Sequence, residues 1–264
     1  MLVLSLDTTT RAGSSAILRD EDVACEQTSD ASREQAERLP GELAALLERE
    51  SVTLPEIDCF AVATGPGSFT GLRVGIATMQ GLAMATRKPL IGVSVFDALA
   101  FLAGFVSAVA VPPGQIDSER SASARTPGFE SRAPDPESRA ESPESRRLVT
   151  WVDAWRGEVF AAGYAADGGV EEPTVGRPED LLAGLHEAAI LFTGDGASRH
   201  RGVILQAVGD RAGFTDPVVP SLAGAIARLA RVRFLAGQRP MPHAIRPIYV
   251  RRSDAELARD AGRA

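Results

Sequence analysis

The sequence predicts an α/β protein of two lobes, in which a mixed sheet flanked by helices occurs twice. An apolar strand over 2–6 ends at Asp7 and returns as a hairpin, and the same order begins again at 148–153, which ends at Asp153 and returns over 158–164. In both halves, stretches with helical periodicity then alternate with short apolar strands. We therefore expect a duplicated unit, with Asp7 and Asp153 at equivalent places.

The first half contains three predicted helices after its opening hairpin. A capping box of Ser32 and Gln35 opens the first helix, and leucines recur along it at helical spacing. The turn Gly65–Gly67 leads into the second helix. The expected strands are 2–6, 14–18, 23–28, 59–63 and 90–93, and the expected helices are 33–47, 69–86 and 95–107.

The stretch 112–147 interrupts this pattern. It is rich in Pro, Ser, Arg and Glu, and Ile116 and Phe129 are its only large apolar residues. Such a segment cannot bury enough apolar surface to offset its ordering entropy. We expect a disordered insertion between a first lobe over 1–111 and a second lobe over 148–264, which ends in a short polar tail.

The second half repeats the strand-then-helix order. Its last helix carries an apolar stripe at positions 222, 226 and 229, typical of a helix packed on a core. The expected strands are 148–153, 158–164 and 189–193, and the expected helices are 178–186, 197–208 and 221–237.

Composition excludes several function classes. Net charge is −7, from 28 basic and 35 acidic residues, so long-range electrostatics oppose a role as the main binder of nucleic acid. Cys25 and Cys59 form no CxxC motif, which excludes a disulfide framework and a thiolate metal site. No long apolar run or signal peptide is present, so we expect a cytoplasmic protein without membrane contact.

The first hairpin turn allows two interpretations. Asp7 ends a buried strand, and the hydroxyls of Thr8 and Thr9 and the tight turn at Gly13 follow it. Backbone N–H groups in such a turn can hold a phosphate or a metal-bound water. Asp and Thr side chains also bond to nearby backbone amides in ordinary turns, and the sequence does not separate the two.

The second glycine-rich turn is more specific. Gly65 and Gly67, followed by Ser68, lead into a helix N-terminus, an arrangement that can bind an anion. The GK[ST] ending of a P-loop is missing, which excludes phosphate transfer by that route. Ser68 lies in G-P-G-S-F and not in G-x-S-x-G, so there is no nucleophile elbow. A third turn, Gly194–Gly196, resembles a faded nucleotide turn, although an ordinary β–α turn is favoured.

The helix over 69–86 contains internal glycines, each of which costs roughly 1 kcal/mol relative to alanine. They fall on two stripes of small residues, and such stripes let another backbone approach closely. Packing on the chain's own sheet accounts for one stripe, whereas two stripes indicate that a further helix, either of this chain or of another chain, covers the second. The stripes are Gly71, Gly75 and Thr78, and Ala77, Gly81 and Ala85.

Five segments, in order along the chain, resemble the TsaB (YeaZ) family. They are DTTT at 7–10, TGPGSFTGLRVGIATMQGLA at 64–83, KPLIGVS at 88–94, VDAWRGEVFAAGY at 152–164 and PIYVRR at 247–252. The resemblance implies the duplicated two-lobe fold of actin-like ATPases and sugar kinases (the ASKHA superfold). It spans nearly all of the chain except 112–147.

The resemblance also implies a function. Such a subunit is a non-catalytic scaffold, required to place threonylcarbamoyl on the adenosine 3′-adjacent to the anticodon in tRNAs. It heterodimerises with a catalytic paralogue, TsaD, through a bundle of first-lobe helices, and works with an ATPase, TsaE. Contact with tRNA is indirect, and a homodimer is plausible when the partner is absent.

Two sets of site residues follow. The partner-binding set is Arg38, Leu39, Phe69, Thr70, Gly71, Arg73, Val74, Gly75, Ala77 and Thr78. The vestigial phosphate loop is Asp7, Thr8, Thr9, Gly65, Gly67, Ser68 and Asp153.

Comparison with the catalytic paralogue and with active kinases indicates that this chain lacks metal ligands and a phosphate-loop glycine. The two histidines of its HxxxH metal site fall on Val95 and Leu99, and the glycine of the DxG motif of active kinases falls on Thr9. We therefore expect no metal site, no catalytic residue and no cofactor bound by this chain alone, with ATP or ADP only in the complex. The chain's own histidines, His186, His200 and His243, form no ligand cluster.

The alternative is an actin-like small-molecule kinase or ATPase that uses Asp7, Asp153 and the glycine turns. It predicts nucleotide binding or turnover by the chain alone. A peptidase is considered only because the family's older name suggests it. The sequence has neither H-E-x-x-H nor a Ser or Cys with a positioned base.

Overall fold

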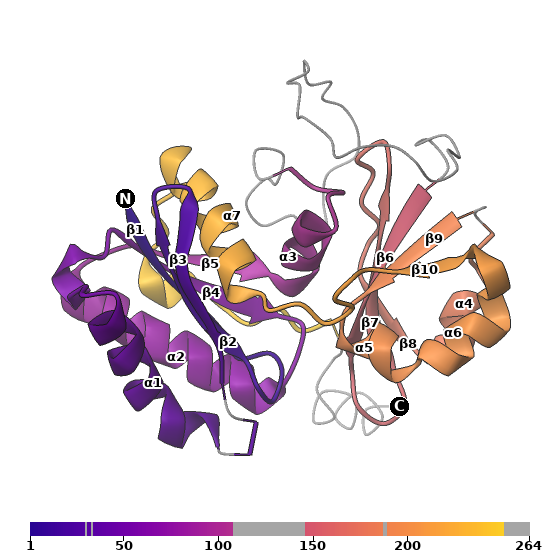
Figure 1. Ribbon diagram of the computed structural model, residues 1–264, viewed down its shortest axis with the longest axis horizontal. Helices are drawn as coiled ribbons and strands as arrows, with labels where there is room; N and C mark the ends of the chain where they lie inside the picture. The colour runs from indigo at the N-terminus through magenta and orange to yellow at the C-terminus, as the bar shows by residue number, and fades with distance from the viewer. Residues whose placement is uncertain (30, 33, 108–145, 187–188, 251–264) are drawn as a thin grey trace, which may run out of the picture.

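The computed structural model places two sheets side by side, with helices between them and on their outer faces (Figure 1). The predicted insertion falls almost wholly outside the described residues, and the polar tail lies outside them entirely. The structure describes residues 1–29, 31–32, 34–107, 146–186 and 189–250.

The first sheet has five strands in the order β3-β2-β1-β4-β5. Strand β1 pairs antiparallel with β2 and parallel with β4, so the hairpin lies on one side of it and the helix-connected strands on the other. The strands are β1 (Leu2–Asp7), β2 (Ser14–Arg19), β3 (Asp22–Thr28), β4 (Cys59–Gly65) and β5 (Leu90–Ser94).

The second sheet repeats this topology. Its order is β10-β9-β6-β7-β8, and β6 pairs antiparallel with β7 and parallel with β9, as β1 does with its neighbours. The predicted duplicated two-lobe fold is therefore confirmed; among the described strands, the short strands β8 and β10 were not predicted. The strands are β6 (Arg146–Asp153), β7 (Val159–Ala165), β8 (Thr174–Gly176), β9 (Ala189–Thr193) and β10 (Ala212–Phe214).

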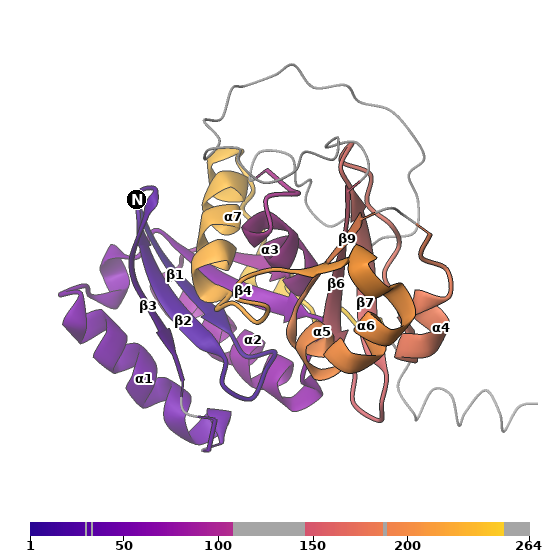
Figure 2. The same ribbon diagram turned by 45° about the vertical axis from the view of Figure 1, so that its right-hand side comes forward.

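Two helices cover the outer face of the first sheet, α1 (Gln35–Arg49) and α2 (Phe69–Thr86) (Figure 2). Leucines 39, 43 and 46 of α1 and Ile76, Met79 and Ala83 of α2 pack there on apolar residues of β1, β2 and β4. Three short helices cover the outer face of the second sheet in the same way. They are α4 (Pro178–Leu182), α5 (Asp195–Arg199) and α6 (Arg201–Val208).

The two remaining helices, α3 (Val95–Leu102) and α7 (Ala223–Leu235), fill the space between the sheets. Helix α7 belongs to the second half of the sequence but packs on the first sheet, where Ser5 Oγ donates to Ala223 O at 2.7 Å. Helix α3 follows β5 but contacts β6 of the second sheet. Helix α7 thus covers the inner face of the other half's sheet, whereas α3 lies between the sheets and contacts both of them.

The end of the described chain also returns to the first lobe. Ile248 N donates to Thr64 O at 2.7 Å, and Gln80 Nε2 on α2 donates to Pro242 O at 2.9 Å. The predicted second lobe over 148–264 is therefore wrong for α7 and the segment after it, because their apolar side chains pack on the first lobe.

A polar cluster joins the two inner helices to the second sheet. Arg233 of α7 pairs with Asp97 of α3 at 3.1 Å and donates to Gly92 O at 2.7 Å, while Tyr164 OH lies 3.5 Å from Asp97 Oδ1. Burial raises the pKa of Asp97, and the Arg233 guanidinium partly offsets this. Arg233 is 6% exposed, and Asp97 thus neutralises its charge where the lobes meet.

Some helix ends differ from the prediction. Helix α1 begins at Gln35, and Glu34 in the N-cap position makes no side-chain cap hydrogen bond, so the predicted capping box is wrong. Helix α3 ends at Leu102, five residues early, and the helix predicted over 197–208 is divided at His200. No helix among the described residues has the length and apolarity needed to cross a membrane.

Candidate functional site: an interlobe cleft and an exposed helix face

A cleft of about 120 Å³ lies between the lobes. The first hairpin turn, the start of α3, the end of β6 and the segment before α7 surround it. Pockets that hold small ligands usually measure roughly 300–1,000 Å³, so this one is small. Its lining residues are Asp7, Thr9, Thr10, Ala12, Gly13, Ser14, Thr28, Val95, Leu99, Val152, Gly194, Asp195, Val219, Pro220, Ser221 and Leu222.

Asp7 is only 3% exposed and faces this cleft. Its Oδ1 accepts hydrogen bonds from Thr9 N at 2.9 Å and from Thr9 Oγ1 at 2.6 Å. Burial raises the pKa of Asp7 and outweighs the lowering by these two bonds, and the charges of Asp195 and Glu26 raise it further. The observed contacts of Asp7 are those of a turn aspartate, one of the two interpretations that the sequence allows.

Asp195, and not Asp153, is the second acid of the cleft. Its Oδ1 accepts from Asp153 N at 3.0 Å and from Gly196 N at 2.9 Å, and burial raises its pKa. Asp153 instead accepts from Trp155 N at 3.1 Å and lies 3.5 Å from Arg199. The expectation that Asp153 lines a phosphate loop opposite Asp7 is therefore corrected; the signal for Asp195 was the turn Gly194–Gly196.

The cleft is poorly suited to a phosphate. Among the described residues that line it there are two carboxylates and no Arg, Lys or His. The N-terminus of α7, beside the cleft, is already capped, because Ala223 N donates to Ser14 Oγ at 3.1 Å and Gly224 N donates to Glu26 Oε1 at 2.8 Å. The carboxylate of Glu26 thus occupies the place at a helix N-terminus where an anion would bind.

Val95 and Leu99, the positions at which the resemblance predicts that metal-binding histidines are replaced, are apolar and line the cleft. Across the described part of the chain, no group of three or more His, Cys, Asp or Glu side chains is placed to hold a metal ion.

The turn Gly65–Ser68 packs against the first hairpin turn and does not line the cleft. Ser68 N donates to Thr9 O at 2.8 Å, and a Cβ added to Gly67 would lie 2.5 Å from Thr9 Cβ. Ser68 Oγ accepts from Gly71 N at 3.2 Å and caps α2. Gly67 and Ser68 therefore hold the other turn in place, and Gly65 packs against Leu72 and the carbonyl of Ile248, which corrects the expected role of all three as part of a phosphate loop.

The first small-residue stripe of α2 is covered from inside the chain. Thr8 Oγ1 donates to Gly71 O at 2.8 Å. A Cβ at Gly71 would lie 2.1 Å from Thr8 O, and a Cβ at Gly75 would lie 2.1 Å from Thr8 Oγ1. These glycines are required because Thr8 approaches the helix backbone so closely.

The second stripe is open. Ala77, Gly81 and Ala85 are exposed, and a Cβ at Gly81 would meet nothing within 4 Å. Of the predicted partner-binding residues, Phe69, Thr70, Arg73 and Ala77 are exposed, and Val74 and Thr78 are partly exposed. We call the exposed set Phe69, Thr70, Arg73, Ala77, Gly81 and Met84 the α2 face.

Four predicted partner-binding residues lie inside the chain. Arg38 and Leu39 are 3% and 2% exposed, and Gly71 and Gly75 lie under Thr8. These four residues were predicted to contact another protein, and the structure corrects this, since all four pack inside the chain. The exposed side of α1 is formed by other residues, namely Ala36, Glu37, Pro40, Gly41, Ala44, Ala45, Glu48 and Arg49.

Tyr249 extends the α2 face at its N-terminal end. Its ring centroid lies 5.6 Å from that of Phe69, and the Arg73 guanidinium lies 3.8 Å from the Phe69 ring centroid. Tyr249 was not among the predicted residues, although it belongs to the PIYVRR segment. The exposed aromatic pair is an apolar contact point beside the small residues of α2.

The chain is similar in sequence to known proteins. Residues 26–113 match a family model described as TsaD, tRNA N6-adenosine threonylcarbamoyltransferase. The Escherichia coli tRNA threonylcarbamoyladenosine biosynthesis protein TsaB is 37% identical over 100 residues, which is 38% of this chain and 43% of that protein. A tRNA N6-adenosine threonylcarbamoyltransferase of Methylorubrum populi is 40% identical over 82 residues, 31% of this chain and 24% of that enzyme. Each match thus spans less than half of the relative's length.

The fold matches over a longer range. The structure of YeaZ from Pseudomonas aeruginosa aligns with a TM-score of 0.65 and 23% identity, covering 94% of this chain and 99% of that one. A second structure from the same organism, of a protein with similarity to peptidase YEAZ, gives a TM-score of 0.65 at 22% identity over 95% of this chain and 99% of that one. The sequence match to TsaB over 100 residues, together with a fold shared with YeaZ, confirms the resemblance of this chain to the TsaB (YeaZ) family.

Proposed function

We propose that this chain takes part in the threonylcarbamoylation of tRNA as a non-catalytic subunit that works by binding a catalytic relative. The observation that carries the proposal is the combination of an open small-residue helix face with a cleft whose described lining has no Arg, Lys or His side chain. The likeness to TsaB supports the pathway, and the match of residues 26–113 to the TsaD model supports descent from a common unit.

The partner is a TsaD-type paralogue that packs helices of its own against α1 and α2. The α2 face is suited to this, since Ala77 and Gly81 let a helix backbone approach closely and Phe69 supplies an apolar anchor. A TsaE-type ATPase joins the complex, and ATP or ADP binds only there. The small, acidic cleft supports the last point, because nothing basic in its described lining would balance a triphosphate.

Substitution on the α2 face tests the partner surface. Ala77→Arg places a long charged side chain in the open stripe and is expected to weaken co-purification with the paralogue from the same cell at least tenfold. Ala166→Arg, the same change at an exposed position of the second lobe, is the matched control. Normal complex formation by the Ala77→Arg protein would remove the basis of the proposed interface.

Calorimetry with ATP tests the alternative of an autonomous kinase or ATPase. The chain alone is expected to give no binding heat and no turnover, whereas the complex with the paralogue and the TsaE-type ATPase binds nucleotide. Turnover by the chain alone that disappears in an Asp7→Asn variant would establish the alternative instead.

A further inference from the structure

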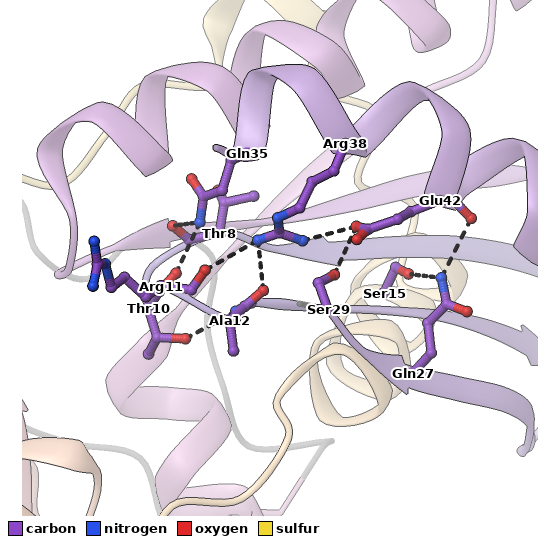
Figure 3. A network of polar contacts seen from close by, with 11 residues as sticks. Thr8, Thr10, Arg11, Ala12, Ser15, Gln27, Ser29, Gln35, Arg38 and Glu42 are labelled. Atoms are coloured by element: carbon purple, nitrogen blue, oxygen red, sulfur yellow. Dashed lines mark hydrogen bonds and ion pairs between the residues drawn. The ribbon is translucent and has the colours of Figure 1, made fainter. Parts of the chain in front are cut away.

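The buried side of α1 holds the first hairpin turn by hydrogen bonds (Figure 3). Arg38 Nη2 donates to Arg11 O at 3.0 Å and to Ala12 O at 2.7 Å, and its Nη1 donates to Glu42 Oε2 at 2.8 Å. Gln35 Nε2 donates to Thr8 O at 3.2 Å and to Thr10 O at 2.8 Å.

Helix α2 holds the same turn from its own N-terminus. Ser68 N donates to Thr9 O at 2.8 Å, and Thr8 Oγ1 donates to Gly71 O at 2.8 Å. All five successive carbonyls over 8–12 therefore accept a hydrogen bond from α1 or from the N-cap of α2. The position of this turn depends on where the two helices lie relative to each other.

The turn also forms one wall of the interlobe cleft, through Thr9, Thr10, Ala12 and Gly13. The opposite sides of α1 and α2 are exposed and carry small residues, with nothing within 4 Å of a Cβ added at Gly41 or Gly81. One pair of helices thus separates an open surface from the wall of the cleft.

We propose that the turn over 8–12 couples this surface to the cleft, so that a paralogue docked on α1 and α2 fixes the shape of the cleft through Gln35 and Arg38. The proposal rests on the proposed function, because it takes the catalytic paralogue as the occupant of the helix face. Its physical basis is geometric: a shift of α1 by about 1 Å, typical of helices at interfaces, takes hydrogen bonds of this length out of range.

Arg38 is the residue through which the coupling passes most directly. Arg38 is 3% exposed, its Nε has no hydrogen-bond partner, and its carboxylate partner Glu42 lies one helical turn along α1. A buried charge of this kind is costly unless its environment is fixed, so Arg38 responds to movement of α1 more sharply than an apolar side chain would.

Hydrogen exchange of the turn tests the coupling on the full chain. The amides of Thr9 and Gly13 donate to Asp7 Oδ1 and Thr10 Oγ1, so their exchange rates report the state of the turn. Addition of the purified paralogue is expected to slow exchange over 8–14 about fivefold or more, the lower end for coupled sites. The Arg38→Met protein, still able to bind through the α2 face, should show less than half of that slowing.

Arg49→Met is the matched control, since Arg49 lies on the same helix, is 62% exposed at its side chain and has no bond to the turn. Should Arg38→Met fail to fold, Gln35→Leu removes the other two bonds to the turn and serves in its place. Binding with unchanged exchange in the unmodified chain, or with equal slowing in the Arg38→Met or Gln35→Leu protein, overturns the coupling alone. Absence of any binding overturns the proposed function, and the coupling with it.

Discussion

We predict that a Gly→Ala substitution has opposite effects on the unfolding free energy in the two small-residue stripes of α2. Gly81→Ala adds a methyl group to open space, so only the helix propensity changes, and the unfolding free energy should rise by about 0.5–1 kcal/mol. Gly75→Ala gains the same propensity, but its methyl would lie 2.1 Å from Thr8 Oγ1, which is far inside van der Waals contact.

Thr8 cannot move away from Gly75 without loss. It is 1% exposed, and its hydroxyl donates to Gly71 O. Overpacking of this kind costs about 1–3 kcal/mol, and a broken buried hydrogen bond costs about 1 kcal/mol more. Gly75→Ala should therefore lower the unfolding free energy by about 1–3 kcal/mol, and the two variants should differ by about 2–4 kcal/mol.

Urea unfolding followed by far-ultraviolet circular dichroism measures both variants under the same conditions. The midpoints should move in opposite directions with the m-value unchanged. Each kcal/mol corresponds to a shift of about 2–4 °C in Tm for a chain of this size, so thermal unfolding gives an independent check. Equal shifts would mean that Thr8 does not cover Gly75, and that the first stripe is as free as the second.

Three further predictions concern buried titratable groups. Burial raises the folded-state pKa of Asp7 above its unfolded value of 3.8, so its stability contribution is complete below that pH and is lost as the pH rises. Asp7→Asn should therefore raise the unfolding free energy at pH 7 and lose that advantage near pH 4. Parallel curves of unfolding free energy against pH for the two proteins over pH 4–8 would contradict this. Asp97→Asn leaves the Arg233 guanidinium without its counter-charge and should cost on the order of 3 kcal/mol in urea unfolding, so a cost below 1 kcal/mol would show that the pair is not needed. Burial raises the pKa of the Cys59 thiol to about 12, so native protein should not react with a thiol reagent at pH 8 until urea unfolds it; rapid labelling of Cys59 in the native state would refute its burial.

Local chemistry made the strands and α2 predictable. The apolar runs that end at Asp7 and Asp153 have the composition of buried strands, and both became the central strands of their sheets. The turn Gly65–Gly67 marked the start of α2, which was predicted at 69 and which the structure places at Phe69. These signals depend on neighbours in the sequence, so no tertiary information was needed.

Long-range contacts decided what the sequence could not show. Gln35 matches the third position of a capping box, but in the structure it is the first residue of α1, and its Nε2 donates to two carbonyls of the hairpin turn. The glycines of α2 indicated close approach correctly, yet whether the approaching group is Thr8 or another protein depends on the fold. Asp195 and Asp153 both follow strands, and the structure alone distinguishes which of them faces the cleft.

The placement of α7 on the first sheet, with α3 packed between the two sheets, makes the halves of the sequence interdependent. A polypeptide that stopped before β6 would leave one face of the first sheet bare, because α7 would be missing, and a polypeptide that began at β6 would lack the contacts that α3 makes with β6. Neither half would therefore behave as an independent domain. If the two halves were produced as separate chains in one cell, however, each would supply the helix contacts that the other lacks. They should then assemble into one particle without a peptide bond between them.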